Sequence, residues 1–338
     1  MNKYLADLLI IIIMDLYEGE RYYTTLDEIG ETLSQYGVAV IPSLLDDFEC
    51  SAMKDGMWDY LEAVSQDFEV PINRQICSSW SGLSELWVKH SMLIQHWSIG
   101  HAQFIWNLRQ NQKVIDVFSK IWGVSGEDLL VSFDGASFHM PPEKTKKGWF
   151  KGKTWYHSDQ SYMRNDLECI QSWMTAYDVN RGDATLTFYE GSHKYHADFR
   201  KKFGWDDKAD WCLLSEEDHH DFYLKEHGCE KHHITCPAGS LVLWDSRTIH
   251  CGQESMKERE ESNFRCVAYL CYTPRAWAKE SVLKRKRKAF DEMRTTNHWP
   301  HKPKMFPKTP RTFGKAIAPI ASIDPPIVND LGRRMAGF

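Results

Sequence analysis

A histidine and an aspartate two residues apart, His157 and Asp159, are the first residues in this chain whose types and spacing could do chemistry. On a β-strand, side chains at i and i+2 project from the same face, so the imidazole and the carboxylate would converge. Two histidines and one carboxylate on one face of an iron ion leave open coordination positions opposite, as in non-heme Fe(II) oxygenases. His250 is the candidate second imidazole, because it follows an apolar, alternating stretch at residues 241–245 that is typical of a strand. These residues predict an iron site, with structural zinc as the chemical alternative.

Arg265 opens another apolar, β-type run, RCVAYLCY, fifteen residues after His250. A guanidinium group can bind a carboxylate through two parallel hydrogen bonds, a geometry that lysine cannot reproduce. This suits a cosubstrate that chelates iron at one end and carries a second carboxylate at the other, such as 2-oxoglutarate. Arg259 is a rival for the role, although it lies in the charged segment ESMKEREES rather than at the start of a strand.

The elements that must position these residues are predicted to be strands preceded by helices. Residues 38–41 form a predicted strand after a helix that Thr25 and Glu28 would begin with a capping box and Gly37 would end. Further helical patterns cover residues 46–66, 99–109 and 111–123, and one strand is predicted over residues 129–139.

The segments HSDQSY (residues 157–162) and RGDATLTFYEGSHK (residues 181–194), with His250 after an apolar strand and Arg265 on the next, resemble the phytanoyl-CoA dioxygenase family of Fe(II)/2-oxoglutarate oxygenases. The resemblance covers residues 25–275. It implies a mainly β protein with flanking helices, built on a double-stranded β-helix, a jelly-roll barrel. It also implies that His157, Asp159 and His250 bind Fe(II), that Arg265 holds 2-oxoglutarate, and that Trp173 lines the cosubstrate pocket. O2 would be consumed, and succinate and CO2 released.

The chain departs from the family pattern where Glu190 replaces the usual proline before Gly191, and where the charged segment lengthens the gap between His250 and Arg265. The turn itself makes a separate prediction. Gly191 should adopt a positive φ and Ser192 should make a local backbone hydrogen bond.

Composition and length predict one elaborated catalytic domain over residues 1–275, with residues 276–338 packed on it. Nine cysteines without a C-x-x-C pair argue against a disulfide framework and favour a reducing, intracellular compartment, the cytoplasm. The apolar run at residues 8–14 is too short to span a bilayer, and we interpret it as a buried first helix.

Two internal segments suggest how a substrate is recognised. The insert at residues 195–232 alternates aromatic and charged residues, which favours a lid. The basic loop at residues 144–153 could steer an anionic small-molecule substrate. A zinc site through His227, Cys229, His232 and Cys236 is a weaker hypothesis, because the spacing matches no standard motif.

The C-terminal stretch is strongly basic. Residues 274–315 carry 13 Lys and Arg against 3 Asp and Glu, a local charge of +10 in a chain of net charge −6. The run Lys284–Lys288 could bind nucleic acid, serve as a nuclear address, or face acidic surface on its own domain, and we favour the last. The proline-rich strap at residues 296–315 is expected to pack through Trp299, Phe306 and Phe313.

These patterns together predict an Fe(II)/2-oxoglutarate-dependent dioxygenase that hydroxylates a small molecule. The alternatives are an oxygenase acting on nucleic acid or protein through the basic C-terminal helix, and a non-catalytic binding protein on the same barrel. A binding module would have no need of all four residues His157, Asp159, His250 and Arg265.

Overall fold

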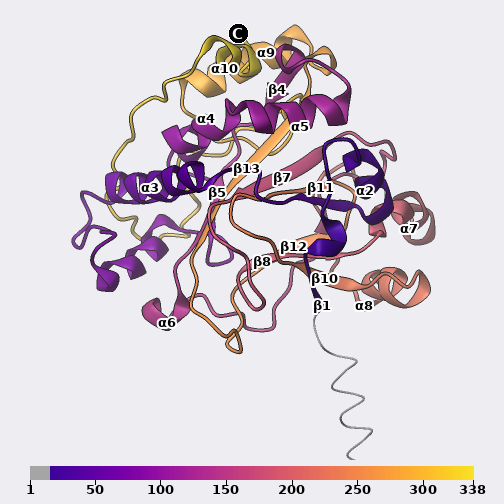
Figure 1. The fold of residues 1–338 in the computed structure, drawn as a ribbon, viewed down its shortest axis with the longest axis horizontal. Helices are drawn as coiled ribbons and strands as arrows, with labels where there is room; N and C mark the ends of the chain where they lie inside the picture. Colours follow the sequence, from indigo (N-terminus) through magenta and orange to yellow (C-terminus); the bar gives the residue numbers. More distant parts are fainter. Residues whose placement is uncertain (1–15) are drawn as a thin grey trace, which may run out of the picture.

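The computed structural model describes residues 16–338, in which two mostly antiparallel sheets face each other and helices cover their outer sides (Figure 1). The predicted jelly-roll barrel is therefore confirmed. The helix expected at residues 8–14 lies outside the described residues. The first sheet has the order β1 (Leu16–Glu18), β10 (Lys231–Ile234), β8 (Thr185–Tyr189), β12 (His250–Gln253), β6 (His157–Ser158), β9 (Cys212–Leu213). The second has the order β2 (Val38–Ile41), β11 (Leu241–Asp245), β7 (Ile170–Thr175), β13 (Arg265–Pro274), β5 (Ala136–His139), β3 (Leu93–Ile94).

The barrel interior is filled by side chains that alternate along the strands of both sheets. Trp173, Val242 and Val267 from the second sheet pack with Leu186 and Phe188 from the first. Successive strand side chains point to opposite faces, so the other set on the second sheet faces outward. That outer face is covered by α3 (Asp47–Val64), α4 (Gln103–Arg109) and α5 (Gln112–Trp122).

The outer face of the first sheet is covered by the insert. The helices α7 (His196–Phe203) and α8 (Glu217–Asp221) and the π-helical turn Phe222–Glu226 pack there around Phe199 and Tyr223. Two parts of the insert join the sheet itself: β9, and the first residues of β10. The insert therefore supports the strand that carries His157.

Two predictions about local structure were wrong. The first helix, α2 (Ile29–Tyr36), begins after Glu28, and Thr25 does not cap its backbone; the capping box belongs instead to α3, between Asp46 and Glu49. The strand predicted over residues 129–139 is divided into β4 (Leu129–Val131) and β5, which pair with different parts of β13. The division falls at Gly135, where a Cβ atom would lie 2.0 Å from the carbonyl oxygen of Ile94.

The C-terminal residues return to the body of the protein. The helix α9 (Glu280–Asp291) and the short α10 (Asp330–Met335) lie beside α4, α5 and β4 (Figure 1); α6 (Pro142–Thr145) lies at the opposite end. Lys286, within the basic run, is fully buried and donates a hydrogen bond of 2.5 Å to the carbonyl oxygen of Val131. The basic run is thus partly a packing element and not a uniformly charged surface.

Candidate metal and cosubstrate site

The three predicted metal ligands lie together. Strands β6 and β12 are neighbours, and His157 and His250 are directly opposite each other in their register. The Nε2 atoms of both histidines lie 3.4 Å from Oδ2 of Asp159. All three residues are buried, and theirs is the one group of three or more potential metal ligands found among residues 16–338.

The orientation of both imidazoles is fixed by the backbone. Nδ1 of His157 donates to the carbonyl oxygen of Trp155 at 3.0 Å, and Nδ1 of His250 donates to that of Thr248 at 2.9 Å. These bonds place the ring proton on Nδ1 and leave the Nε2 lone pairs directed at the space beside Asp159. Gln171, on β7, donates from Nε2 to Oδ2 of Asp159 at 3.0 Å and so orients the carboxylate.

The charge states of these groups suit a divalent cation. Burial alone would raise the pKa of Asp159, but His157 and His298, with hydrogen bonds from His157 and His250, hold that pKa well below its usual range. Burial and the neighbouring His157 lower the pKa of His250. An ionised carboxylate beside a neutral imidazole is the state that binds a metal without first releasing protons.

The GSHK turn supports the strand of His250. Gly191 has a φ of 72°, as predicted. The hydroxyl of Ser192 does not make the predicted local bond; it accepts a hydrogen bond of 2.9 Å from the backbone N–H of Ile249, the residue before His250. Glu190, at the place of the usual proline, accepts two hydrogen bonds of 2.8 Å from Arg21 and one from Tyr22. The turn thus fixes both the distal histidine and the N-terminal segment.

Arg265 points into the barrel and has no acidic partner among residues 16–338. Its guanidinium group donates to Ser137 Oγ at 3.1 Å and to the carbonyl oxygen of Ala184 at 2.9 Å, and it lies 5.2 Å from the ring centre of Trp173. Arg265 is only 6% exposed, and no ion pair within residues 16–338 involves it. A buried cation without a counter-charge is costly, so this position favours an anionic ligand.

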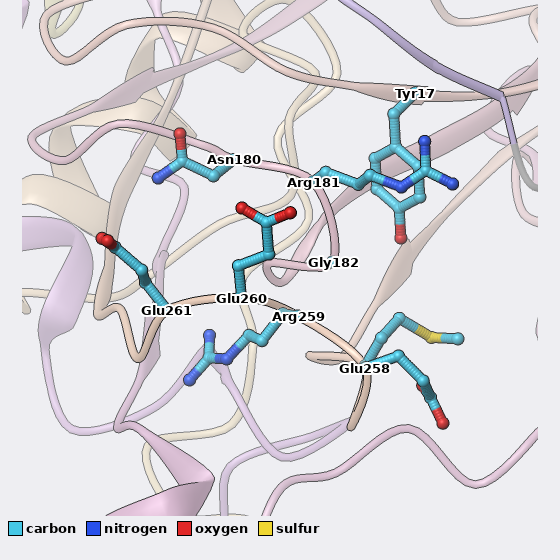
Figure 2. Close-up of a pocket in the computed structure, with 9 residues that line it drawn as sticks. Tyr17, Asn180, Arg181, Gly182, Glu258, Arg259, Glu260 and Glu261 are labelled. Carbon is cyan, nitrogen blue, oxygen red and sulfur yellow. The ribbon is translucent and has the colours of Figure 1, made fainter.

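Arg259, the rival, has its charge satisfied by the protein. It pairs with Glu143 at 2.6 Å and with Asp183 at 2.9 Å, and its side chain is 1% exposed. It borders a cavity of ≈ 610 Å³ whose lining includes Tyr17, Arg181 and Glu260 (Figure 2). No residue of the His157–Asp159–His250 triad lines that cavity. The geometry favours Arg265 for a cosubstrate carboxylate.

Aromatic rings that the sequence analysis did not assign surround the triad. Trp155 stacks on His157 with ring centres 4.9 Å apart, and His90 also stacks on Trp155, at 4.0 Å. Trp211, which is 53% exposed, lies 5.7 Å from His157. Trp155 could have been found from its place two residues before His157. Trp211 could not, because only the pairing of β9 with β6 brings it there.

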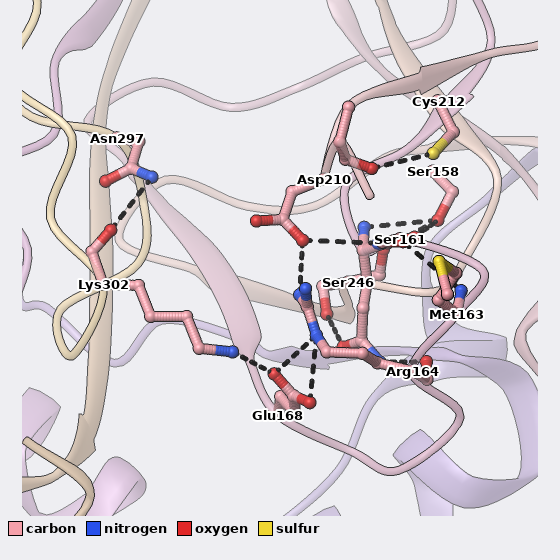
Figure 3. Close-up of polar contacts among 12 residues, drawn as sticks. Ser158, Ser161, Met163, Arg164, Glu168, Asp210, Cys212, Ser246, Asn297 and Lys302 are labelled. Carbon is pink, nitrogen blue, oxygen red and sulfur yellow. Dashed lines mark hydrogen bonds and ion pairs between the residues drawn. The ribbon is translucent and has the colours of Figure 1, made fainter. Parts of the chain in front are cut away.

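A polar network joins three segments that are distant in the sequence (Figure 3). Arg164 pairs with Glu168 at 3.0 Å and also with Asp210, and Glu168 accepts a further bond from Lys302 at 2.5 Å. The loop after His157, the insert and the C-terminal strap are thus tied together.

The zinc site proposed for residues 227–236 does not form. His227 stacks on Tyr195 at 3.9 Å, whereas Cys236 contributes to the barrel interior. The four side chains do not come together as a group of potential metal ligands in the described structure.

Comparison with known proteins identifies the family. Residues 33–260, more than half of the chain, match the family "Phytanoyl-CoA dioxygenase (PhyH)". The chain belongs to the phytanoyl-CoA dioxygenase family. A curated relative of this PhyH-family protein, "Ava biosynthesis cluster protein O" of Aspergillus versicolor, is 27% identical over 244 residues, or 70% of this chain and 75% of the relative.

Solved structures share the fold of this PhyH-family protein. The GlcNAc Inducible Gene 2 protein (DUF1479) of Candida albicans is 12% identical with a TM-score of 0.51, covering 78% of this chain and 67% of that one. The epimerase SnoN, in complex with Fe3+, alpha ketoglutarate and nogalamycin RO, is 14% identical with a TM-score of 0.48, covering 74% and 83%. Within residues 16–338, no helix combines the length and apolar character needed to cross a membrane.

Proposed function

We propose that this protein is an Fe(II)/2-oxoglutarate-dependent dioxygenase that hydroxylates a small molecule. The observation that carries the proposal is the pairing of two unsatisfied groups inside one barrel. One is the His157–Asp159–His250 cluster, whose oriented donor atoms suit iron. The other is Arg265, a buried guanidinium group without an acidic partner in the part of the chain that the structure describes. A dicarboxylate that chelates the metal would satisfy both.

Separate groups of residues would bind the metal and the cosubstrate. His157, Asp159 and His250 would hold Fe(II), with Gln171 fixing the carboxylate. Arg265 would bind the distal carboxylate of 2-oxoglutarate over the face of Trp173, whose indole N–H has no hydrogen-bond partner among the described residues. The bound metal and cosubstrate supply the oxidation of a C–H bond by O2, with release of succinate and CO2. The ring of Trp155, stacked on His157, would help to fix the imidazole in place.

The small-molecule part of the proposal has separate support. The curated relative carries the words "biosynthesis cluster protein" in its name. The basic run on α9, which would have to serve a nucleic-acid substrate, has Lys286 buried and Arg287 paired with Glu280 at 2.5 Å. These contacts favour a small molecule over nucleic acid.

An anaerobic titration tests the proposal. The protein is loaded with Fe(II), 2-oxoglutarate is added, and the metal-to-ligand charge-transfer absorption is followed; succinate is then measured after O2 is admitted. We expect one Fe(II) and one 2-oxoglutarate per chain, and succinate formed only when both are present.

Zinc serves as the discriminating control. If the site is a structural zinc site, the protein should bind Zn(II) tightly. The Fe(II)-loaded protein should then show no absorption change when 2-oxoglutarate is added, and no succinate should form. That set of results would overturn the proposal.

A further inference from the structure

Two cysteine thiols that the proposed function does not use lie in contact with each other. Sγ of Cys169, which directly precedes β7, is 3.2 Å from Sγ of Cys271 on β13. Both side chains are buried, with exposed fractions of 0% and 1%. All nine cysteines of the chain are free, and among residues 16–338 no other two cysteine sulfur atoms form such a contact. In the described structure, this is therefore the pair whose sulfur atoms are placed to form a disulfide.

The register of the second sheet places both thiols on the face that carries Gln171. Cys271 is directly opposite Gln171 in the pairing of β13 with β7, and directly opposite residues of an antiparallel pair project from the same face. Cys169 lies two residues before Gln171, and alternation puts it on that face as well. Because Gln171 donates to Oδ2 of Asp159 at 3.0 Å, the thiols adjoin the side chain that orients the metal-binding carboxylate.

The C-terminal strap closes over the two thiols. Trp299 on the strap is 1% exposed and forms a small buried cluster with both cysteines. The side chains of Arg164 and Lys302 lie 5.3 Å and 5.0 Å from its ring centre, and both pair with Glu168 (Figure 3). A large oxidant would have to displace Trp299 to reach the thiols, so the oxidant that suits this site is small.

Burial also makes these thiols slow to react. It raises the pKa of Cys169 well above the usual range of a thiol, and the neighbouring Cys271 raises that pKa further. The thiolate is the form that attacks an oxidant, and little of it is present at neutral pH. A small, uncharged oxidant in excess is therefore needed, and hydrogen peroxide has these properties.

We propose that hydrogen peroxide joins Cys169 and Cys271 in a reversible disulfide, and that this bond weakens metal binding at the neighbouring site. One sulfur atom is first oxidised to a sulfenic acid, as the O–O bond of the peroxide breaks and one water molecule leaves. The second thiol then attacks that sulfur, the S–S bond forms, and the oxygen leaves as a second water molecule. Two thiols and one peroxide thus give one disulfide and two water molecules, with two electrons passed from sulfur to oxygen.

The bond should disturb Gln171. Residues two positions out of register on neighbouring strands have Cα atoms about 7–8 Å apart, whereas a disulfide usually spans Cα distances of about 4.4–6.8 Å. Closing the bond therefore pulls the chain just before β7 toward β13. It also removes the S–H group of Cys271, which donates to the carbonyl oxygen of Ile170 at 3.1 Å. The effect on the metal rests on the proposed function, because it requires Asp159 to be a ligand, but formation of the disulfide does not.

Peptide mapping of the full-length protein tests the bond. The reduced, metal-free protein is treated with hydrogen peroxide at about pH 8, where more thiolate is present, then unfolded with iodoacetamide and digested with trypsin. We expect peptides 165–181 and 266–275 to be joined, and fragmentation to assign the link to Cys271 and not to Cys266. A reducing agent should separate the two peptides. Oxidation of the exposed Cys77 in the same sample shows that the peroxide has acted. A link through Cys266, or recovery of both thiols in alkylated form, would overturn the proposal.

Equilibrium dialysis with Mn(II) tests the consequence. The oxidised protein should bind Mn(II) about 10-fold or more weakly than the reduced protein, the range for a disturbed outer-shell partner of a metal ligand, and reduction should restore the affinity. Cys271→Ser cannot form the bond, so peroxide should not change its Mn(II) affinity, whereas Cys77→Ser should respond like the native chain. Cys169→Ser gives the same comparison if Cys271→Ser does not fold.

The two measurements separate this inference from the proposed function. A disulfide that leaves Mn(II) affinity unchanged would overturn its role in metal binding. A reduced protein that binds no Mn(II) would contradict the proposed function, while the peptide map would still decide whether the disulfide forms.

Discussion

Arg259 and Arg265 lie six residues apart in the sequence, and both side chains are buried, but the surrounding charges differ. Arg259 pairs with Glu143 and Asp183. Arg265 meets a hydroxyl, a carbonyl oxygen and an aromatic ring. The loop around Arg259 is thus electrostatically complete, whereas the barrel interior around Arg265 leaves a charge unmatched. Because burying an unpaired charge is costly, we propose that a ligand supplies the anionic partner of Arg265.

The His157–Asp159–His250 cluster is the second region that we expect a ligand, the metal ion, to complete. A substitution there should have the largest effect on ligand binding. Replacing Asp159 by alanine removes a metal ligand, which should cost more than the 10- to 100-fold typical of lost outer-shell partners. We therefore expect Asp159→Ala to lower Mn(II) affinity by more than about 100-fold, as measured by equilibrium dialysis. Asp166→Ala, an exposed carboxylate on the following loop, is the matched control. Metal binding retained in Asp159→Ala would place the metal elsewhere.

The free energy of unfolding should fall more when Arg259 is replaced than when Arg265 is replaced. Arg259→Met leaves the carboxylate of Asp183 buried and unpaired, so we expect it to lower the free energy of unfolding by about 3 to 5 kcal/mol. Arg265→Met removes a cation that has no anionic partner, and its metal-free form should lose much less. Urea unfolding of both variants without metal or cosubstrate makes the comparison. Equal losses would show that Arg265 also has a structural role.

Features that short sequence motifs encode were predictable from the sequence. Strand alternation alone predicted only a β-rich protein with flanking helices, and the family resemblance of the segments around His157, His250 and Gly191 implied the barrel and the candidate ligands. The partner of Ser192 was not predictable, since its bond to Ile249 spans 57 residues. Trp211 was missed for the same reason, since only the pairing of β9 with β6 brings it beside His157, and no periodicity encodes that pairing.

For 2-oxoglutarate affinity, unlike for stability, a substitution of Arg265 should have a larger effect than one of Arg259. Arg265→Lys keeps the charge but loses the two-pronged geometry, and we expect it to weaken 2-oxoglutarate binding by about 1.5 to 3 kcal/mol. Arg259→Lys should change that affinity little, because Arg259 is already engaged by Glu143 and Asp183. Anaerobic titration of the Fe(II) protein measures both. A larger effect at Arg259 would assign the cosubstrate carboxylate to the charged loop.

Lys286 is a third buried basic residue to compare with Arg259 and Arg265, and we expect no ligand to bind it. It is fully buried over the ring of Phe133, and burial, with Arg109 nearby, lowers its pKa to about 7. In the unfolded chain a lysine titrates near 10.4. Between these two values the unfolded state binds a proton that the folded state lacks, so this residue makes stability rise with pH and lowers it as pH falls toward 7. In Lys286→Met this contribution is absent.

Urea unfolding between pH 7 and pH 8.5 checks the point; thiols of the unfolded chain also titrate in this range, but they contribute equally to the native protein and the variant. Lys286→Met also leaves the Val131 carbonyl oxygen without its donor, but that cost does not depend on pH and cancels in the comparison. The stability of the native protein relative to the variant should therefore increase by about 1 to 2 kcal/mol across the range. Parallel curves would mean that Lys286 stays protonated in the fold. Its charge would then be stabilised by the Val131 carbonyl oxygen and the Phe133 ring, and a buried cation in this protein would need no anion to complete it.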